Sequence, residues 1–585
     1  MKWDLTHMYK STDDWDKNFK KIEKLVDELV TYKGNLKNNL EEFFIKSEEA
    51  DIIMADLYVY AHFALDLDMS NQEAAARAKK IENLNATNAE KMSWESSELL
   101  SIGEEEIMKL VEKSSKLKEY RHTFDALFYS KEHILDEDKE KLLSYFSNFS
   151  STPNEIYKAF RYADDKSFKL KLGNGKTIDV MDQNYNSLIK DTKDQQDRKK
   201  IFETFYKQFE DNKNMLANLY LSIVKKDVAY SKARNYESTL HSYLHSDKVP
   251  IDVYMTLIKT ARANSNYLKK YLKLRKKVLG LSHYYSFDKF VPLTNVNTKY
   301  SYSEAKRLVL ESIKDLPKDY IEKIESAIQD GFVDVLPSKT KRGGAYSWSA
   351  YRSHPYILLN YDKSLDYILT LAHEAGHSAH SMYSKEAQPY ATHDYSIFVA
   401  EVASTFSERM VTDYLLKTFK KKEEKISLLQ QLIDDIVATF FRQAMFAEFE
   451  YTIHKLVEDN EPVTEQVLSK IASDLYKDYY GIDLRKEKSK RLWWAFIPHI
   501  YNSPFYVYKY ATCFTITSKL YEDYKKESSK FSNFIDLLKA GEDDYPFEQI
   551  LKRGVDLRKE ETYMTVINEL KILVKELESV IDAKE

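Results

Sequence analysis

The chain has 585 residues, of which 43% are hydrophobic and 14% aromatic, so it carries enough apolar side chains for a large folded core. Its formal net charge of −5 excludes the basic field of a nucleic-acid binder, and its single cysteine excludes an internal disulfide. Because no apolar leader and no apolar run of membrane-spanning length are found, we expect a cytoplasmic protein that binds neither nucleic acid nor membrane; the oligomeric state is left open.

Most of the chain predicts amphipathic α-helices, because only 12 glycines and 11 prolines interrupt it. Clear helical patterns cover residues 15–30, 48–84 and 561–584. The exception in the first half is FKLKLGNGKTIDV, residues 168–180, whose Gly-Asn-Gly turn predicts a β-hairpin. No flexible linker divides the chain, so we expect two helical lobes, an N-terminal one of residues 1–195 and a second one of residues 196–585 that holds the motifs described below.

Three short strands are predicted before residue 362. The segments FVDVLPS, GGAYSWS and PYILLNY begin at Phe332, Gly343 and Pro355, and each combines β-branched and aromatic residues with flanking turn residues. They would form a small sheet. An exposed edge of such a sheet can hold an extended peptide through main-chain hydrogen bonds, whatever the side chains of the peptide.

The pentapeptide HEAGH at residues 373–377 carries the strongest chemical signal. Its surroundings, residues 365–384, show a helical apolar stripe, and on a helix His373 and His377 project side by side and can bind one zinc ion. Glu374 is then placed to act as general base toward a zinc-activated water. Gly376 weakens the helix, which predicts the close approach of another backbone. A chain of this composition holds about 0.03 such matches by accident, so incidental surface histidines are the less favoured interpretation.

A catalytic zinc needs a third protein ligand. The metzincin pattern requires Gly and His where this chain has His380 and Tyr383, so that class is excluded. The segment SIFVAEVASTFSERM, residues 396–410, predicts a second helix with Glu401 and Glu408 on one face. We expect Glu401 to be the ligand rather than half of a buried salt bridge, and Glu408 to be either a solvated charge or a partner of a ligating imidazole.

HEAGH followed by AEVAST resembles the M3 family of zinc metallopeptidases, and specifically its oligoendopeptidase F branch. The segments GGAYSW, HPYILLNY, IPHIYNSPFYVYKYAT and AGEDDYPFEQILKRGVDL are also similar to that branch, so the resemblance covers roughly residues 110–575. It implies a mainly α fold in which two helical lobes enclose a deep substrate channel with zinc at its floor. It also implies that the sheet edge with Gly344, Ala345 and Tyr346 binds substrate beside the zinc.

The same resemblance suggests how the negative charge of the transition state is stabilised. The family pattern of a histidine followed by closely spaced tyrosines implies that Tyr508, or else His499, donates a hydrogen bond to the developing oxyanion. Tyr501 and Tyr506 are then expected to contact the substrate.

The function expected from the sequence is zinc-dependent cleavage of internal peptide bonds in short unstructured oligopeptides, with Glu374 as general base. Two alternatives differ from it in chemistry. One is a non-catalytic helical carrier that binds peptides in the same cleft. The other is an aminopeptidase of the gluzincin type, which the missing Gly-x-Met-Glu-Asn segment disfavours.

Overall fold

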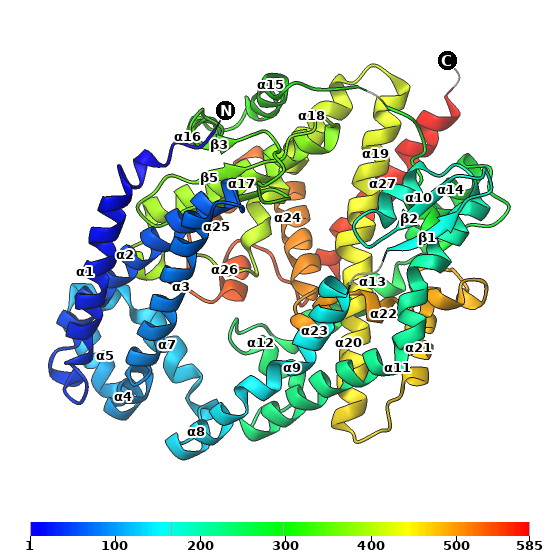
Figure 1. Cartoon of the computed structure of the whole chain (residues 1–585). Coiled ribbons are helices and arrows are strands. Elements are labelled where there is room, and N and C mark those ends of the chain that lie inside the picture. Colours follow the sequence, from blue (N-terminus) through cyan, green and yellow to red (C-terminus); the bar gives the residue numbers. More distant parts are fainter. Residues whose placement is uncertain (1, 165–166, 297, 584–585) are drawn as a thin grey trace. The chain divides into compact units, whose positions relative to one another are not determined.

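The computed structural model of the chain describes residues 2–164, 167–296 and 298–583. The structure is mainly α-helical, with two small sheets (Figure 1). It comprises two compact units, each built from three separated segments: unit 1 holds residues 1–131, 297–418 and 520–555, and unit 2 holds residues 132–296, 419–519 and 556–585. The lobe boundary expected near residue 195 lies within unit 2, where a long helix begins, and it stays a prediction.

Unit 1 contains an N-terminal run of helices, the three-stranded sheet and the helices that follow the sheet. Its elements are α1 (Thr12–Val30), α2 (Leu40–Leu67), α3 (Gln72–Met92), α4 (Glu95–Ile102), α5 (Glu104–Lys113), α6 (Ser115–Glu119), α7 (Arg121–Tyr129), α15 (Tyr302–Ile313), α16 (Lys318–Ala327), β3 (Val333–Asp334), β4 (Tyr346–Trp348), β5 (Tyr356–Leu358), α17 (Leu365–Ala387), α18 (Ala400–Thr418), α25 (Phe531–Leu538) and α26 (Pro546–Lys552). The helix expected over residues 48–84 is two helices, because Asp68 and Asn71 accept hydrogen bonds from nearby backbone N–H groups and form a turn with a new N-cap.

The predicted small sheet is present in unit 1, in the order β3-β5-β4. Strand β3 runs parallel to β5, and β4 runs antiparallel to β5, with Ser347 opposite Ile357. One face of the sheet buries Tyr356 and Leu358 against Phe63 of α2 and against Trp3. Because this apolar face is fixed on the N-terminal segment, the sheet is anchored beside the helices that follow it.

Unit 2 is built around the long helix α11. Its helices are α8 (Glu137–Tyr145), α9 (Ser147–Lys158), α10 (Tyr185–Asp191), α11 (Gln195–Ala233), α12 (Thr239–Leu244), α13 (Ile251–Ala263), α14 (Asn266–Val278), α19 (Lys422–Ile436), α20 (Arg442–Glu458), α21 (Glu465–Tyr480), α22 (Trp493–Phe496), α23 (Pro498–Asn502), the first part of α24 (Tyr508–Lys526) and α27 (Glu560–Asp582). The predicted hairpin is confirmed: β1 (Phe168–Lys171) pairs antiparallel with β2 (Thr177–Val180).

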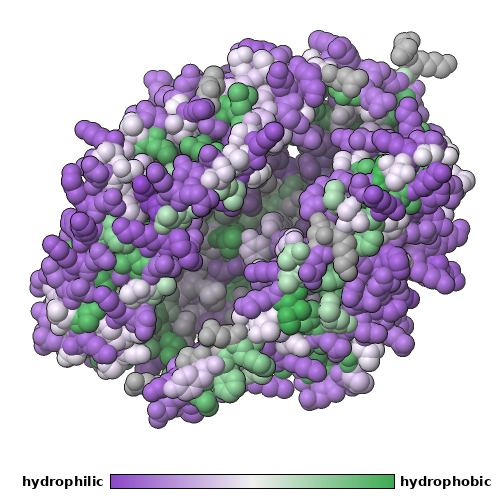
Figure 2. Space-filling view, in the orientation of Figure 1, coloured by the Kyte–Doolittle hydropathy of each residue, from purple (hydrophilic) through white to green (hydrophobic). Residues whose placement is uncertain are grey.

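Polar and charged side chains cover most of the surface in the view of Figure 2, and apolar residues there form small groups. This is the ordinary condition of a folded protein surface. In the part of the chain that the structure describes, no helix combines the length and the apolar character needed to cross a membrane.

Candidate metal centre

Helix α17 carries the HEAGH motif, as the sequence predicts. The helix starts after the N-cap Ser364, whose backbone N–H donates to the carboxylate of Asp362 at 2.8 Å. His373 and His377 lie one turn apart in the middle of the helix, where the backbone is fixed by hydrogen bonds on both sides. Their imidazoles are therefore held side by side by regular helical geometry.

Helix α18 carries the predicted third ligand. The helix begins at Ala400, four residues later than the sequence indicates, because the Ser396 hydroxyl accepts from the Phe398 backbone N–H at 3.2 Å and forms a separate turn. Glu401 therefore lies in the first turn of the helix. Its carboxylate reaches the two histidines of α17.

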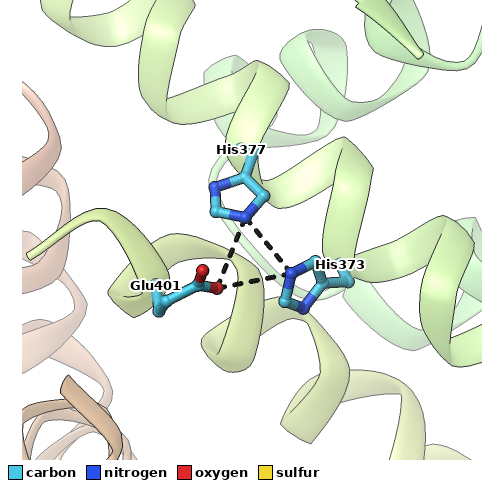
Figure 3. A group of neighbouring side chains, drawn as sticks. All are labelled: His373, His377 and Glu401. Atoms are coloured by element: carbon cyan, nitrogen blue, oxygen red, sulfur yellow. Dashed lines mark hydrogen bonds and ion pairs between the residues drawn. The ribbon is translucent and has the colours of Figure 1, made fainter. Parts of the chain in front are cut away.

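The three predicted ligands point toward one another, as Figure 3 shows. The Nε2 atoms of His373 and His377 are 3.2 Å apart, and Oε2 of Glu401 lies 3.3 Å from the first and 3.4 Å from the second. Tetrahedral ligands about 2.0–2.1 Å from a zinc ion lie about 3.3–3.4 Å from one another. The donor atoms thus form one face of a tetrahedron of the size that zinc requires, and a fourth position remains for water or substrate.

Gly376 makes this arrangement possible. A Cβ atom at Gly376 would lie 2.6 Å from the carbonyl oxygen of Ala403 and 2.8 Å from Cα of Ser404, distances that are shorter than real contacts. The two helices therefore touch at the glycine, backbone against backbone. This is the close approach that the sequence predicts, and it brings Glu401 within reach of the histidines.

Two further side chains of α18 contact the candidate ligands. Nδ1 of His373 lies 2.5 Å from Oε1 of Glu408, and the hydroxyl of Ser404 donates to Oε2 of Glu401 at 2.9 Å. A carboxylate on Nδ1 fixes the ring and leaves Nε2 as the metal donor. Of the two alternatives for Glu408, the structure therefore supports the partner of a ligating imidazole.

The charges of the centre shift the pKa values of its members. Burial would lower the pKa of His373, but the hydrogen bond and the charge of Glu408 outweigh it and raise that pKa to about 9. Burial would raise the pKa of Glu401, but the hydrogen bond with His377 and the two imidazoles hold it at about 2. Glu401 is thus an anion, the form in which a carboxylate binds a metal, whereas His373 must lose its proton before its Nε2 can bind one.

Glu374 lies next to these ligands and is nearly inaccessible, with 5% of its surface exposed. Burial raises its pKa above the usual range for a glutamate, and the two histidines oppose that shift. The carboxyl group of Glu374 therefore holds a proton more tightly than the carboxyl group of an exposed glutamate does.

His380, one turn beyond His377, packs rather than binds. It is fully buried, and its ring stacks on Tyr395 with centroids 3.6 Å apart. Burial and the neighbouring imidazole of His377 lower its pKa to about 3.

The only cysteine, Cys513, is also buried.

Strand β4 lies beside α17 in unit 1. The hydroxyls of Ser347 and Ser378 are 2.8 Å apart, and Ser378 follows His377 directly. Strand β4 pairs with β5 on one side, and no other strand of the described residues pairs with its second side. The hydroxyl of Tyr346 donates to Asp66 at 2.6 Å, so this phenol already has a partner within the protein.

The carbonyl of Gly344 accepts a hydrogen bond from the side-chain amide of Asn360 at 2.8 Å, which fixes the loop that leads into β4. Gly344 has a φ of +84°, a conformation that favours glycine. Ala345, between this loop and β4, is partly exposed. The substrate roles of Gly344, Ala345 and Tyr346 stay predictions.

The predicted tyrosines lie in unit 2, and two of them are core residues. Tyr501 is fully buried, stacks on Tyr157 with centroids 3.8 Å apart and donates to the carbonyl of Leu216 at 3.3 Å. Tyr508 is also 0% exposed and packs against Tyr254. Their assignments, as substrate contact and as oxyanion donor, stay predictions, but neither side chain presents surface to a ligand in this structure.

A partly exposed cluster surrounds the predicted His499. The hydroxyl of Tyr510 lies 3.4 Å from Nε2 of His499, and the rings of Tyr506 and Tyr510 meet edge to face at 5.3 Å. The sequence pattern alone does not indicate Tyr510. The available signal was the helix that begins at Tyr508: in its first turn Tyr508 and Tyr510 lie about 200° apart, so one faces the core and the other faces away.

The turn before these tyrosines is held by a buried acid. Phe505 has a φ of +54°, which is unfavourable for a bulky residue, and its backbone N–H donates to Oε1 of Glu450 at 3.1 Å. Glu450 lies on α20 and is fully buried, and burial raises its pKa to about 8. Glu450 therefore fixes the backbone that sets the direction of Tyr506.

Comparison with known proteins identifies the family. Residues 188–569 match the model of peptidase family M3, and residues 98–166 match a model described as oligopeptidase F. The chain is 34% identical over 588 residues to an oligoendopeptidase F homolog of Borreliella burgdorferi, which covers 99% of this chain and 98% of the relative. It is 33% identical over 560 residues to the oligopeptidase PepF of Bacillus subtilis, covering 95% and 83%.

Solved structures agree with the sequence comparison. The crystal structure of oligoendopeptidase-F from Enterococcus faecium superposes with a TM-score of 0.75 at 26% identity and covers 98% of this chain and all of that one. A protein of Chlamydophila abortus, solved as a candidate peptidase, superposes with a TM-score of 0.90 at 30% identity and covers 99% and 98%. The chain therefore belongs to peptidase family M3, in its oligopeptidase F branch, and is an oligoendopeptidase of that family of metallopeptidases.

Proposed function

We propose that the protein is a zinc-dependent endopeptidase that cleaves internal bonds of short, unstructured oligopeptides. The observation that carries this proposal is the set of three donor atoms spaced 3.2–3.4 Å apart on α17 and α18, with Glu374 beside them. Two imidazoles and one carboxylate with a fourth position left for water form the ligand set of a catalytic zinc, whereas a structural zinc has four protein ligands.

When bound by His373, His377 and Glu401, zinc supplies Lewis-acid polarisation of the scissile carbonyl and lowers the pKa of its water. Glu374 accepts the proton of the attacking water and delivers it to the amine of the leaving peptide. Proton transfer by one positioned carboxylate contributes roughly 10²–10⁴-fold to the rate. No covalent bond between enzyme and substrate is needed, because water itself is the nucleophile.

The chain's own residues also position the peptide. We propose that the unpaired side of β4 binds the substrate backbone as an added strand, since β4 lies against α17 and so beside Glu374. Main-chain hydrogen bonds do not depend on side chains, so cleavage would tolerate many sequences. A folded protein has no free extended segment to add there, which favours short unstructured substrates.

Two alternatives make different predictions. A peptide carrier would bind peptides without hydrolysis, and an aminopeptidase would release single residues from the N-terminus. The presence of ligands, orienting carboxylate and general base together favours an enzyme over a carrier, because a carrier needs none of them.

The test uses the zinc-loaded full-length protein and internally quenched peptides of graded length, with products identified by mass. We expect internal cleavage that is lost on chelation and restored by zinc. Glu374→Gln should retain zinc and lose roughly 10²–10⁴-fold in kcat, whereas the exposed control Glu423→Gln should match the parent. Zinc bound in both proteins without cleavage would instead identify a carrier, and single-residue products would identify an aminopeptidase.

A further inference from the structure

Unit 2 contains a cavity that the peptidase chemistry does not use. Its volume is about 250 Å³, close to the lower end of the range for small-molecule sites. Its walls come from α14, from the turn after it, from α19 and its π-helical continuation, from α20 and α21, and from the segment 490–497. The cavity thus lies among six stretches of chain that belong to one compact unit.

Eight of the twenty residues that line the cavity are aromatic. They are Tyr271, Tyr284, Phe290, Phe446, Tyr476, Tyr480, Trp493 and Phe496. Tyr476 stacks on Tyr480 with centroids 4.6 Å apart, and Phe446 stacks on Trp493 at 4.8 Å. These stacks give the wall a rigid shape, so the cavity is suited to a flat or branched apolar group.

Two charged residues of the wall, Arg275 and Asp434, form an ion pair. Arg275 is fully buried and donates to the hydroxyls of Tyr271 and Tyr284 and to backbone carbonyls, and it lies 3.5 Å from Asp434. Asp434 also accepts from Tyr271 at 2.7 Å and from Gln430 at 3.1 Å. This arginine and this aspartate therefore leave no net charge for a ligand to neutralise.

Three further cations, Lys289, Arg442 and Lys490, line the same cavity, and none of them forms a hydrogen bond or ion pair with a carboxylate in the described residues. Lys490 donates to the hydroxyl of Tyr206 at 2.8 Å. Within the described residues, no hydrogen bond or ion pair joins the ammonium of Lys289 or the guanidinium of Arg442 to an acceptor, although the more distant charge of Asp434 acts on Lys289. Nε of Arg442 is buried. All three residues are only partly exposed, and Lys289 and Arg442 retain donors that nothing in the described part of the protein accepts.

The cations also repel one another. Burial first, and then the charges of Lys490 and Arg442, hold the pKa of Lys289 well below its usual range. The charge of Asp434 opposes this shift, and all three cationic residues line the same cavity. An anion among them would replace mutual repulsion by charge-assisted hydrogen bonds, which are the strong class.

We propose that this cavity binds a carboxylate attached to an aromatic or branched aliphatic body. The carboxylate would lie between Lys289 and Arg442, and the body would pack against the stacked tyrosines and Trp493. The planar guanidinium suits a carboxylate, which it can bind through two parallel hydrogen bonds. The C-terminal residue of a peptide and a free aromatic acid share this chemistry, so both are possible sources of the ligand. The cavity shares no residue with the candidate zinc centre, and the inference does not depend on the proposed catalytic mechanism.

The first experiment titrates the full-length zinc-loaded protein with N-acetylphenylalanine and with N-acetylphenylalaninamide, followed by calorimetry and by the fluorescence of the tryptophans, one of which lines the cavity. We expect saturable binding of the acid and binding at least 10-fold weaker for the amide, because only the acid carries the charge. Equal affinity of the two compounds, or no saturable binding up to millimolar concentration, would overturn the proposal and leave a water-filled cavity.

Variants locate the site. Lys289→Met and Arg442→Met should each weaken binding of the acid by 10-fold or more, whereas Lys225→Met, an exposed lysine on α11, should leave it unchanged. Both cavity variants remove an unpaired charge, so their Tm without ligand should equal or exceed that of the parent, which verifies folding. Unchanged affinity in both would show that the acid binds elsewhere and would refute the assignment.

A competition experiment then distinguishes the two sources of the ligand, the C-terminal residue of a peptide and a free aromatic acid. A Glu374→Gln protein is titrated with the acid in the presence of an octapeptide ending in phenylalanine, either with a free C-terminus or amidated. Displacement by the free-ended peptide alone identifies the C-terminal residue of a peptide as the ligand. Retained binding of the acid beside either peptide identifies a free small acid.

Discussion

At Gly376, helix α17 lies so close to α18 that a methyl group there would be 2.6 Å from the carbonyl oxygen of Ala403. The contact joins the helix that holds both histidines to the helix that holds Glu401. The geometry of the metal centre therefore depends on a residue that bears no ligand atom.

Gly376→Ala should separate the two helices, because backbone atoms on α18 cannot move aside as a side chain can. We expect a loss of about 1–3 kcal/mol in the free energy of unfolding and a weaker zinc affinity. Calorimetry and zinc titration against a competing chelator measure both. Gly343→Ala is the matched control, since its Cβ would meet open space and its φ is not left-handed. A Gly376→Ala protein with parental zinc affinity would show that the close approach is not needed for the site.

Glu408→Gln should weaken zinc binding by roughly 10–100-fold, which is the usual cost of losing a carboxylate partner of a ligating histidine. The carboxylate lies 2.5 Å from Nδ1 of His373 and fixes both the ring and its tautomer. Zinc affinity from chelator competition is the readout, and Glu423→Gln is the control. If affinity were unchanged, Glu408 would be a surface charge that merely lies near the ring.

Tyr510→Phe should lower kcat by roughly 100-fold with little change in KM, the expected effect of losing an oxyanion donor. The sequence assigns this role first to Tyr508, but Tyr508 is 0% exposed whereas Tyr510 is partly exposed and touches His499. Tyr508→Phe should therefore change kcat by less than about two-fold. Steady-state kinetics with one quenched peptide decides between the two, and a large loss in Tyr508→Phe alone would restore the first assignment.

Glu450→Gln should change how stability depends on pH. The pKa of Glu450 is raised to about 8 in the folded protein, above the ordinary value of about 4.3 in an unfolded chain. Between these values the folded protein keeps the proton that the unfolded chain loses, so the free energy of unfolding falls as pH rises from about 4.3 to 8.

A glutamine carries no such proton and can still accept from the Phe505 backbone. We therefore expect Glu450→Gln to raise the Tm at pH 8 relative to the parent, by an amount equivalent to about 1–3 kcal/mol, and to match the parent near pH 4.5. Thermal unfolding at a series of pH values tests this. A variant less stable than the parent at pH 8 would show that the ionised carboxylate is the form that the fold needs.

Much of the metal centre could be predicted because the relevant information is local. His373 and His377 are one helical turn apart, and the helical repeat alone places their rings together. Gly376 within the motif correctly indicated a backbone contact. The beginning of α18 was predicted four residues early, because the side chain of Ser396 forms its own turn and competes with the helix.

The tyrosines after His499 show where local reasoning ends. Their spacing is visible in the sequence, but which of them is buried depends on neighbours distant in the chain, such as Tyr157 and Tyr254. Because the segment is rich in aromatic residues, its sequence does not indicate which tyrosine is buried. Only the packing in the folded protein shows that Tyr508 is buried and that Tyr510 is partly exposed.

The sequence by itself determined the helical class, the small sheet and the placing of His373 and His377 side by side with Glu374 next to them, since each follows from a pattern that repeats every few residues; the role of Glu374 as general base stays a prediction. The tertiary structure decided the rest: the approach of α18 through Gly376, the partnership of Glu408 with His373, the burial of two tyrosines, the assembly of each unit from three separated segments, and the cationic cavity of unit 2. The physical reason is that these features arise from contacts between residues far apart in the chain, and such contacts depend on how whole helices pack rather than on any repeat within one of them.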